Sequence, residues 1–180
     1  MGHDFKEKIV ISAGGSMVVP DDIDLDFVQS FQELIRRHVE RGVQFLIIIG
    51  GGAPARRYMT ALREIRPDVS GEDTDWMGIY TTILNAQFMR LAFKDDVYPD
   101  IVTDPTVVKE SDSPIIFGAG WKPGWSTDYD AVELANTIGA KKVINLSNID
   151  YVYDDDPKKN PDAKPVKEIS WADYRKIIPT

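Results

Sequence analysis

One apolar segment, Val43–Ile49, limits the fold more than any other part of this sequence. Its last five residues are Phe-Leu-Ile-Ile-Ile, and no polar residue alternates with them after Gln44. Strands that are buried on both faces have this pattern, and they occur in parallel sheets with helices on each side. The segment therefore predicts an α/β fold.

The same succession of strand, glycine-rich loop and helix recurs about four times along the chain, which predicts a mostly parallel sheet. We expect strands at residues 9–11, 43–49, 114–117 and 143–146, with shorter ones at 101–102 and 107–108. Apolar residues at helical spacing predict helices at residues 27–39, 54–63, 75–93, 131–138 and 171–178. Candidate N-caps are Asp24 or Asp26 for the first helix, the run Ser126-Thr127-Asp128 for the fourth and Ser170 for the last.

Length and composition exclude several classes of protein. The chain has 180 residues, which is typical of one domain, and it contains no cysteine for disulfides, thiol catalysis or metal binding. Its net charge of −8 disfavours partners such as nucleic acid or an anionic membrane. Neither a signal peptide nor an apolar run of the ~20 residues that cross a bilayer is present. We therefore expect a soluble cytoplasmic protein.

Glycine-rich loops follow the predicted strands, and ligands of parallel sheets bind at the carboxyl ends of the strands. Gly14, Gly15 and Ser16 form either a phosphate-binding loop or a structural turn. The triple glycine at residues 50–52 indicates either close approach of a ligand or packing of the backbone. Arg56, one helical turn later, is a candidate phosphate ligand, although exposed arginines at such positions are often only solvated.

Two further segments carry candidate chemistry. Asp75 precedes a helical pattern, so it is either an N-cap or an acceptor for sugar hydroxyls. The segment at residues 120–128 combines two tryptophans, Lys122 and Asp128. Tryptophans in a glycine loop can stack on a base or line an interface. Asp128 is placed to orient a lysine or a magnesium-bound phosphate. The segment at residues 151–156 is either an acidic solvated loop or a site where a tyrosine ring meets adenine.

Five segments together resemble the amino acid kinase family and, within it, the uridylate (UMP) kinases of the archaeal type. They are ISAGGS, IIGGGAPARRY, DWMGIYTTILNA, GWKPGWSTDYDAVELA and LSNIDYVYDDDPKKNPDAK. Their order and spacing match the family across nearly the whole chain. The resemblance implies a three-layer αβα sandwich with a mostly parallel central sheet, in a single domain over residues 1–180 that is short at its C-terminus.

The resemblance also implies an activity, the transfer of the γ-phosphoryl group of ATP to UMP, and a set of site residues. Mg²⁺ is expected to arrive on the nucleotide phosphates, and a homo-oligomer, a hexamer in the family, is expected. The residues that match the ATP site are Ala13, Gly14, Gly15, Ser16, Gly52, Arg56, Ser147, Asn148, Tyr153 and Asp156. Those that match the UMP site are Gly51, Asp75, Trp121, Lys122, Pro123, Gly124, Trp125, Ser126 and Thr127. Asp128, Lys122 and Arg56 are the expected catalytic residues.

This sequence departs from the family in ways that leave alternatives open. Bacterial members have a lysine just before the first glycines, where this chain has Ser12 and Ala13, so Lys122 or Lys8 is expected to supply the cation. Tyr151 replaces a glycine that is common in the nucleotide loop. The alternatives are a kinase for another small acid, such as carbamate or an acylated amino acid, and a non-catalytic nucleotide-binding or storage protein on the same fold.

Overall fold

The computed structural model describes residues 5–108, 111–148, 151–155, 157, 160–170 and 172–173. Its central sheet has four parallel strands: β1 (Glu7–Ala13), β2 (Val43–Ile49), β3 (Ile115–Gly118) and β4 (Lys142–Leu146). The strand order is β3-β2-β1-β4. The chain therefore extends the sheet to one side of β1 and then crosses to the other side to form β4. Ligands of open parallel sheets bind at such a reversal, beyond the carboxyl ends of the strands.

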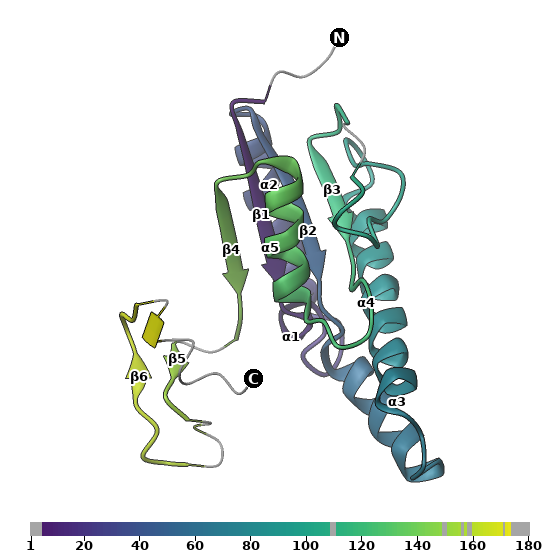
Figure 1. Ribbon diagram of the computed structural model, residues 1–180. Helices are drawn as coiled ribbons and strands as arrows, with labels where there is room; N and C mark the ends of the chain where they lie inside the picture. Colours follow the sequence, from purple (N-terminus) through teal and green to yellow (C-terminus); the bar gives the residue numbers. More distant parts are fainter. Residues whose placement is uncertain are drawn as a thin grey trace. The chain divides into compact units, whose positions relative to one another are not determined.

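Helices cover both faces of this sheet, as Figure 1 shows. The helices are α1 (Gly15–Val18), α2 (Leu25–Val39), α3 (Gly52–Ile65), α4 (Gly71–Phe93) and α5 (Thr127–Ile138). α5 lies on one face of the sheet and α2 lies on the other. The predicted α/β sandwich with a parallel sheet is confirmed. Among the helices that the described residues form, none is long and apolar enough to cross a membrane.

Alternate residues of β1, β2 and β3 contribute to two separate hydrophobic cores. In β2, Phe45, Ile47 and Ile49 belong to the larger core, which α2 and α4 cover. Leu46 and Ile48 belong to the smaller core beneath α5. Every residue of β2 is buried, so the apolar run has the double burial that its sequence predicts.

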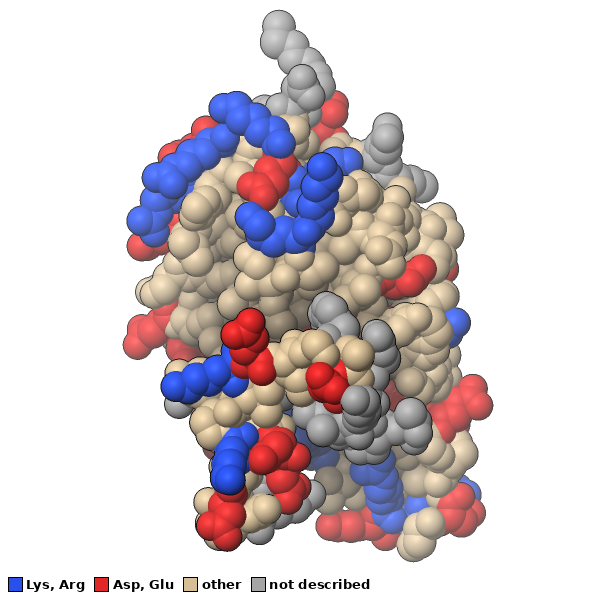
Figure 2. Space-filling model, turned by 60° about the vertical axis from the view of Figure 1, so that its left-hand side comes forward, with Lys and Arg blue, Asp and Glu red and all other residues tan. Residues whose placement is uncertain are grey.

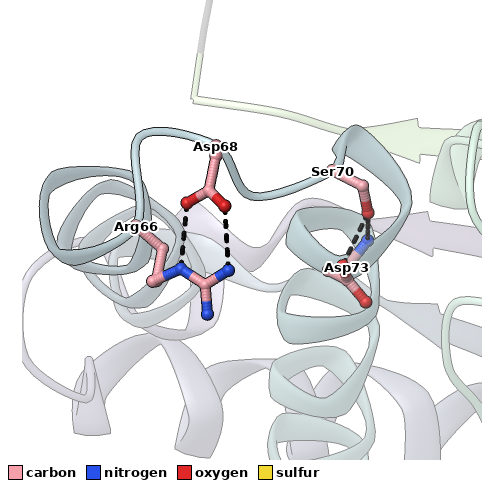
Figure 3. Close-up of polar contacts among 4 residues, drawn as sticks. All are labelled: Arg66, Asp68, Ser70 and Asp73. Atoms are coloured by element: carbon pink, nitrogen blue, oxygen red, sulfur yellow. Dashed lines mark hydrogen bonds and ion pairs between the residues drawn. The ribbon is translucent and has the colours of Figure 1, made fainter.

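Several helix boundaries follow from side-chain caps. Asp24 caps α2, since its carboxylate accepts the Phe27 N–H, and Ser126 caps α5 in the same way. α4 starts earlier than predicted, because Ser70 is its N-cap and accepts the Asp73 N–H (Figure 3). Just before this cap, Arg66 forms a two-pronged ion pair with Asp68, also drawn in Figure 3.

Three local expectations need correction. Asp75 is not an N-cap, because it lies in the interior of α4, five residues after Ser70. The first glycine turn contains a short helix, α1. Residues 107–108 form no strand, and of the pair at 101–102 only Val102 makes a bridge, to Gly118.

Residues 148–180 form a second compact unit, apart from residues 1–147. Within it, β5 (Val152–Tyr153) pairs antiparallel with β6 (Pro165–Val166) across a polar loop. Ser170 accepts the Asp173 N–H there, but most of the helix predicted at 171–178 lies outside the described residues. The expectation of one domain over residues 1–180 stays a prediction.

The loop after β1 packs backbone against backbone on the loop after β2. A Cβ atom added to Gly15 would lie 2.6 Å from the Gly50 carbonyl oxygen and closer still to the Gly52 nitrogen. A Cβ atom on Gly52 would lie 2.6 Å from the Gly15 oxygen and 2.7 Å from the Val19 oxygen. Since Gly52 also has a φ of +66°, no other residue fits there without strain. Backbone packing is therefore one reason for these glycines.

We predict that Gly15→Ala destabilises the protein by about 1–3 kcal/mol or more, because its new methyl group would overlap backbone atoms that cannot move independently. Gly71→Ala is the matched control, since a Cβ at Gly71 meets nothing within 4 Å. That change is expected to be neutral or to stabilise α4 by up to about 1 kcal/mol. Thermal unfolding measures both variants, and equal melting temperatures would contradict the packing account.

Candidate functional site

A cavity of about 460 Å³ opens beside the carboxyl ends of β2 and β3. The loop after β2, the loop after β3 and α4 all contribute to its lining. Eight of the residues predicted to bind nucleotide lie together in this lining: Gly51, Gly52, Asp75, Lys122, Gly124, Trp125, Ser126 and Thr127. Gly51 and Thr127, which are more than 70 positions apart in the sequence, thus line the same cavity. The role of these eight residues in binding nucleotide stays a prediction.

Two side chains of α4 hold the backbone of the loop after β3. Asp75 Oδ2 accepts the Gly124 N–H at 2.8 Å, and Thr82 Oγ1 accepts the Gly120 N–H at 2.8 Å. The Thr82 hydroxyl donates in turn to the Ile79 carbonyl at 2.6 Å. These contacts fix both ends of the loop that carries Trp121 and Lys122. Thr82 was missed from the sequence, where its only signal is a polar residue on the buried face of a helix.

Asp128 lies at the start of α5 and reaches the end of β1. The Ser12 hydroxyl, which is 1% exposed, donates to Asp128 Oδ1 at 2.6 Å. Ser12 stands immediately before Ala13 and the first glycine loop, so this bond brings Asp128 to that loop. Carboxylate and hydroxyl oxygens are ligands suited to a hard cation such as Mg²⁺. Ser12 was not among the predicted site residues, because a hydrogen bond across 116 positions leaves no local sequence pattern.

The Lys122 ammonium group lies over two tryptophan rings. Its Nζ is 3.7 Å from the centroid of the Trp121 ring and 4.3 Å from that of Trp125. Trp125 in turn meets the ring of Tyr129 edge-on, with centroids 4.1 Å apart. The attraction between the ammonium group and the two rings restrains this lysine beside the cavity. The predicted pairing of Lys122 with Asp128 across a phosphoryl group stays a prediction.

Asp130, also in the first turn of α5, is a fully buried carboxyl group. Its Oδ2 accepts the Trp121 N–H at 3.1 Å, and among the described residues Oδ1 has no partner. Burial raises the pKa of Asp130 to about 6, against the opposing effects of the Trp121 N–H and the Lys122 charge. The sequence does not reveal this burial, because an aspartate in the first turn of a helix has the same local pattern whether it is buried or exposed.

Among the described residues, the other predicted site residues do not line this cavity. Arg56 is exposed on α3, four residues after Gly52, and its neighbour Arg57 pairs with Asp21. The residues predicted for the nucleoside end of ATP are divided: Ser147 follows β4, Asn148 and Tyr153 belong to the second unit, and Asp156 lies outside the described residues. Trp121 and Pro123 flank the residues that line the cavity.

Charges of both signs are interspersed on the face of the molecule that Figure 2 shows.

Within the described part of the chain, no group of three or more histidine and acidic side chains is placed to hold a metal ion on its own. A cation at Asp128 would therefore need further ligands, which the phosphates of a nucleotide can supply.

We predict that Asp130→Asn stabilises the protein at neutral pH. Asp130 ionises near pH 4 in the unfolded chain and near pH 6 in the folded protein, so the folded state binds more protons between these values. The stability contributed by this group is therefore present below about pH 4 and is lost as the pH rises to about 6. Asparagine does not ionise, so the Asp130→Asn variant does not lose stability in this way as the pH rises.

The free energy of unfolding of Asp130→Asn should exceed that of the wild type by about 1–3 kcal/mol above pH 6. The two proteins should converge near pH 4. Urea unfolding at several pH values between 4 and 7 measures the difference, with the half-buried Glu133→Gln as control. A constant difference across this range would contradict the assignment.

Comparisons with known proteins agree with this fold and this set of loops. Residues 7–179 match the model of the amino acid kinase family. The chain is 34% identical over 167 residues to the uridylate kinase of Thermococcus onnurineus, an alignment that covers 91% of this chain and 72% of that protein.

Solved structures give the same result. The crystal structure of uridylate kinase from Archaeoglobus fulgidus has 30% identity and a TM-score of 0.76, with 94% of this chain and 76% of that chain covered. The UMP kinase of Bacillus anthracis, at 19% identity and a TM-score of 0.71, shares the fold. The matched family model, the sequence relatives and the parallel sheet with its glycine loops agree: this chain belongs to the amino acid kinase family.

Proposed function

We propose that this protein is a UMP kinase that transfers the γ-phosphoryl group of ATP to UMP and releases UDP and ADP. The observation that carries the proposal is the cavity itself, where two glycine loops, Asp75 and Lys122 meet in a chain similar to uridylate kinases. Backbone N–H groups and a lysine suit phosphate, and a carboxylate suits the hydroxyls of a ribose.

The chemistry requires little covalent participation from the protein. An oxygen of the UMP phosphate attacks the γ-phosphorus of ATP, and the bond from that phosphorus to the β-γ bridging oxygen breaks, so its electrons leave on ADP. The attacking oxygen already carries negative charge, and no general base is needed. What the site must supply is in-line placement and positive potential around the transferred group. Lys122, Arg56 and the N–H groups of Gly51 and Gly52 are our candidates for that role.

Asp128 is the residue we propose to organise the catalytic cation. Ser12 occupies Oδ1 of this exposed carboxylate, so Oδ2 is the oxygen that would face Mg²⁺. Mg²⁺, when bound with ATP, would neutralise charge that develops on the phosphate oxygens. Gly14 and Gly15, which lie just beyond Ser12 and Ala13, would hold the phosphates of ATP on their backbone.

The nucleoside of ATP is assigned to Ser147, Asn148, Tyr153 and Asp156 by family resemblance. Both substrates are nucleotides of the cytoplasm, which favours a cytoplasmic enzyme.

We further propose that the protein forms homo-oligomers through α4. Three large apolar side chains on one side of this helix, Tyr80, Leu84 and Leu91, are 60–65% exposed. Positions 80, 84 and 91 fall on one side of a helix, because they are separated by about one turn and about two turns. Such an apolar side can pair with its own copy about a two-fold axis. The native mass in solution tests this proposal.

The activity is tested by coupled detection of ADP with ATP and three acceptors: UMP, CMP and carbamate. Turnover with UMP at the highest kcat/KM supports the proposal. Turnover with carbamate alone would identify a kinase for another acid. Nucleotide binding without any turnover would identify a binding protein on the same fold.

We predict that Arg56→Ala lowers kcat/KM about ten- to a hundredfold, because a lost charge-assisted bond to phosphate costs roughly 1.5–3 kcal/mol. Arg57→Ala is the matched control, since Arg57 is exposed on the same helix but pairs with Asp21. Steady-state kinetics on both variants should separate them, while their melting temperatures stay close to the wild type. Equal kcat/KM values for the two variants would remove Arg56 from the site.

Asp75→Asn should weaken UMP binding more than ATP binding. Asp75 Oδ2 already accepts the Gly124 N–H, so the ribose hydroxyls depend on the second oxygen. Asparagine has only one acceptor oxygen, and either the loop or the ribose loses its partner. Separate calorimetric titrations with UMP and ATP measure this, and an equal loss of affinity for both nucleotides would refute the assignment.

A further inference from the structure

A buried amide on α4 holds the glycine loop after β2. Asn85 is 5% exposed, and its Nδ2 donates to the Gly50 carbonyl at 2.9 Å and to the Gly51 carbonyl at 3.1 Å. An asparagine amide nitrogen carries two hydrogens, so one side chain satisfies both carbonyls. Asn85 lies one turn beyond Thr82, which binds the other glycine loop.

These two bonds also determine where the neighbouring N–H groups point. The Gly50 carbonyl shares a peptide group with the Gly51 N–H, and the Gly51 carbonyl shares one with the Gly52 N–H. In a planar trans peptide the C=O and N–H bonds point in opposite directions, and this chain has no cis peptide among its described residues. Because Asn85 draws both carbonyls toward α4, both N–H groups face away from it.

The same two N–H groups lie at the start of α3, where the nitrogen of Gly52 packs beside Gly15 of the loop after β1. Of the first-turn donors of α3, the Ala53 N–H is bonded to the Val19 carbonyl, and Pro54 has none. Within the described part of the chain, no oxygen accepts the N–H of Gly51 or Gly52. Both residues line the cavity. A carbonyl turned into the same space would repel an anion.

We propose that Asn85 is a positioning residue: by holding the Gly50 and Gly51 carbonyls, it keeps the N–H groups of Gly51 and Gly52 directed at a phosphoryl group. This inference rests on the proposed function only in that the ligand carries phosphate. Asn85 itself touches no reacting atom. Its effect is on the dipoles of two peptide groups between glycines. The Gly50 carbonyl depends most on Asn85, because the Gly51 carbonyl also accepts the Ala55 N–H of α3 at 3.4 Å.

The test compares Asn85→Ala with Thr81→Val. Thr81 is also 5% exposed on α4, but its hydroxyl donates to the Met77 carbonyl within the helix and reaches no loop. Asn85→Ala removes two hydrogen bonds of a buried side chain of α4, and Thr81→Val removes one, but only the first variant releases the glycine loop. Asn85→Asp is a second variant of nearly the same shape, which has lost the donors.

Inorganic pyrophosphate is the probe, and its affinity is measured by calorimetry beside kcat and KM for UMP and ATP. We expect Asn85→Ala and Asn85→Asp to weaken pyrophosphate binding and to lower kcat/KM by tenfold or more relative to Thr81→Val. Amide hydrogen exchange at residues 50–52 should also be faster in the Asn85 variants than in Thr81→Val. If both Asn85 variants match Thr81→Val in affinity, kcat/KM and exchange, the proposal is overturned.

The two proposals fail separately. A wild-type protein that binds pyrophosphate but phosphorylates no UMP refutes the proposed function, while the affinity difference between the variants still decides the role of Asn85. A wild-type protein that phosphorylates UMP but loses nothing on Asn85→Ala refutes the positioning role alone. If Asn85→Ala unfolds, the comparison of Asn85→Asp with Thr81→Val gives the decision. Absence of both pyrophosphate binding and turnover in the wild type overturns both.

Discussion

The contact between the backbones of the two glycine loops is the constraint on which the rest of the site depends. No side chain separates Gly15 from Gly50 and Gly52, so the start of α3 lies directly against the loop after β1. A single methyl group on Gly15, Gly50 or Gly52 would force the loops apart. Because the loops meet backbone to backbone, their peptide dipoles are concentrated at the carboxyl edge of the sheet. An anion at this edge would be bound by N–H groups more than by side chains.

α4 supplies the second constraint, because its side chains hold the backbone of the loops after β2 and β3. Asp75, Thr82 and Asn85 lie along one face of the helix, and each bonds to the backbone of a glycine in a loop. The opposite side of the same helix exposes apolar residues, among them Leu84. If that side forms the proposed contact with a second copy, α4 connects the interface to the loops after β2 and β3. Oligomer formation would then stabilise the loops that hold phosphate.

The sequence predicted elements whose signals are local, and it missed contacts between distant residues. The apolar run of β2, a cap of α5 within residues 126–128 and the convergence of glycine loops all follow from short patterns. The start of α4 was misplaced, because Asp75 has the residue type of a cap but the helix begins at Ser70. The buried Asp130 and the bond between Ser12 and Asp128 depend on which segments meet in three dimensions. No pattern within a window of 10 to 20 residues contains that information.

The residue that bonds to Asp128 at the start of the first glycine loop, Ser12, is uncharged. The hydroxyl of Ser12 orients Asp128 but brings no positive charge. The ammonium group of Lys122 lies over Trp121 and Trp125, and its charge acts on the carboxyl group of Asp130. Asp128 is an exposed carboxylate in the first turn of α5, so a divalent cation bound to nucleotide could approach it from solvent. In that arrangement the N–H dipoles provide direction, and the proposed Mg²⁺ adds its charge to those of Lys122 and Arg56.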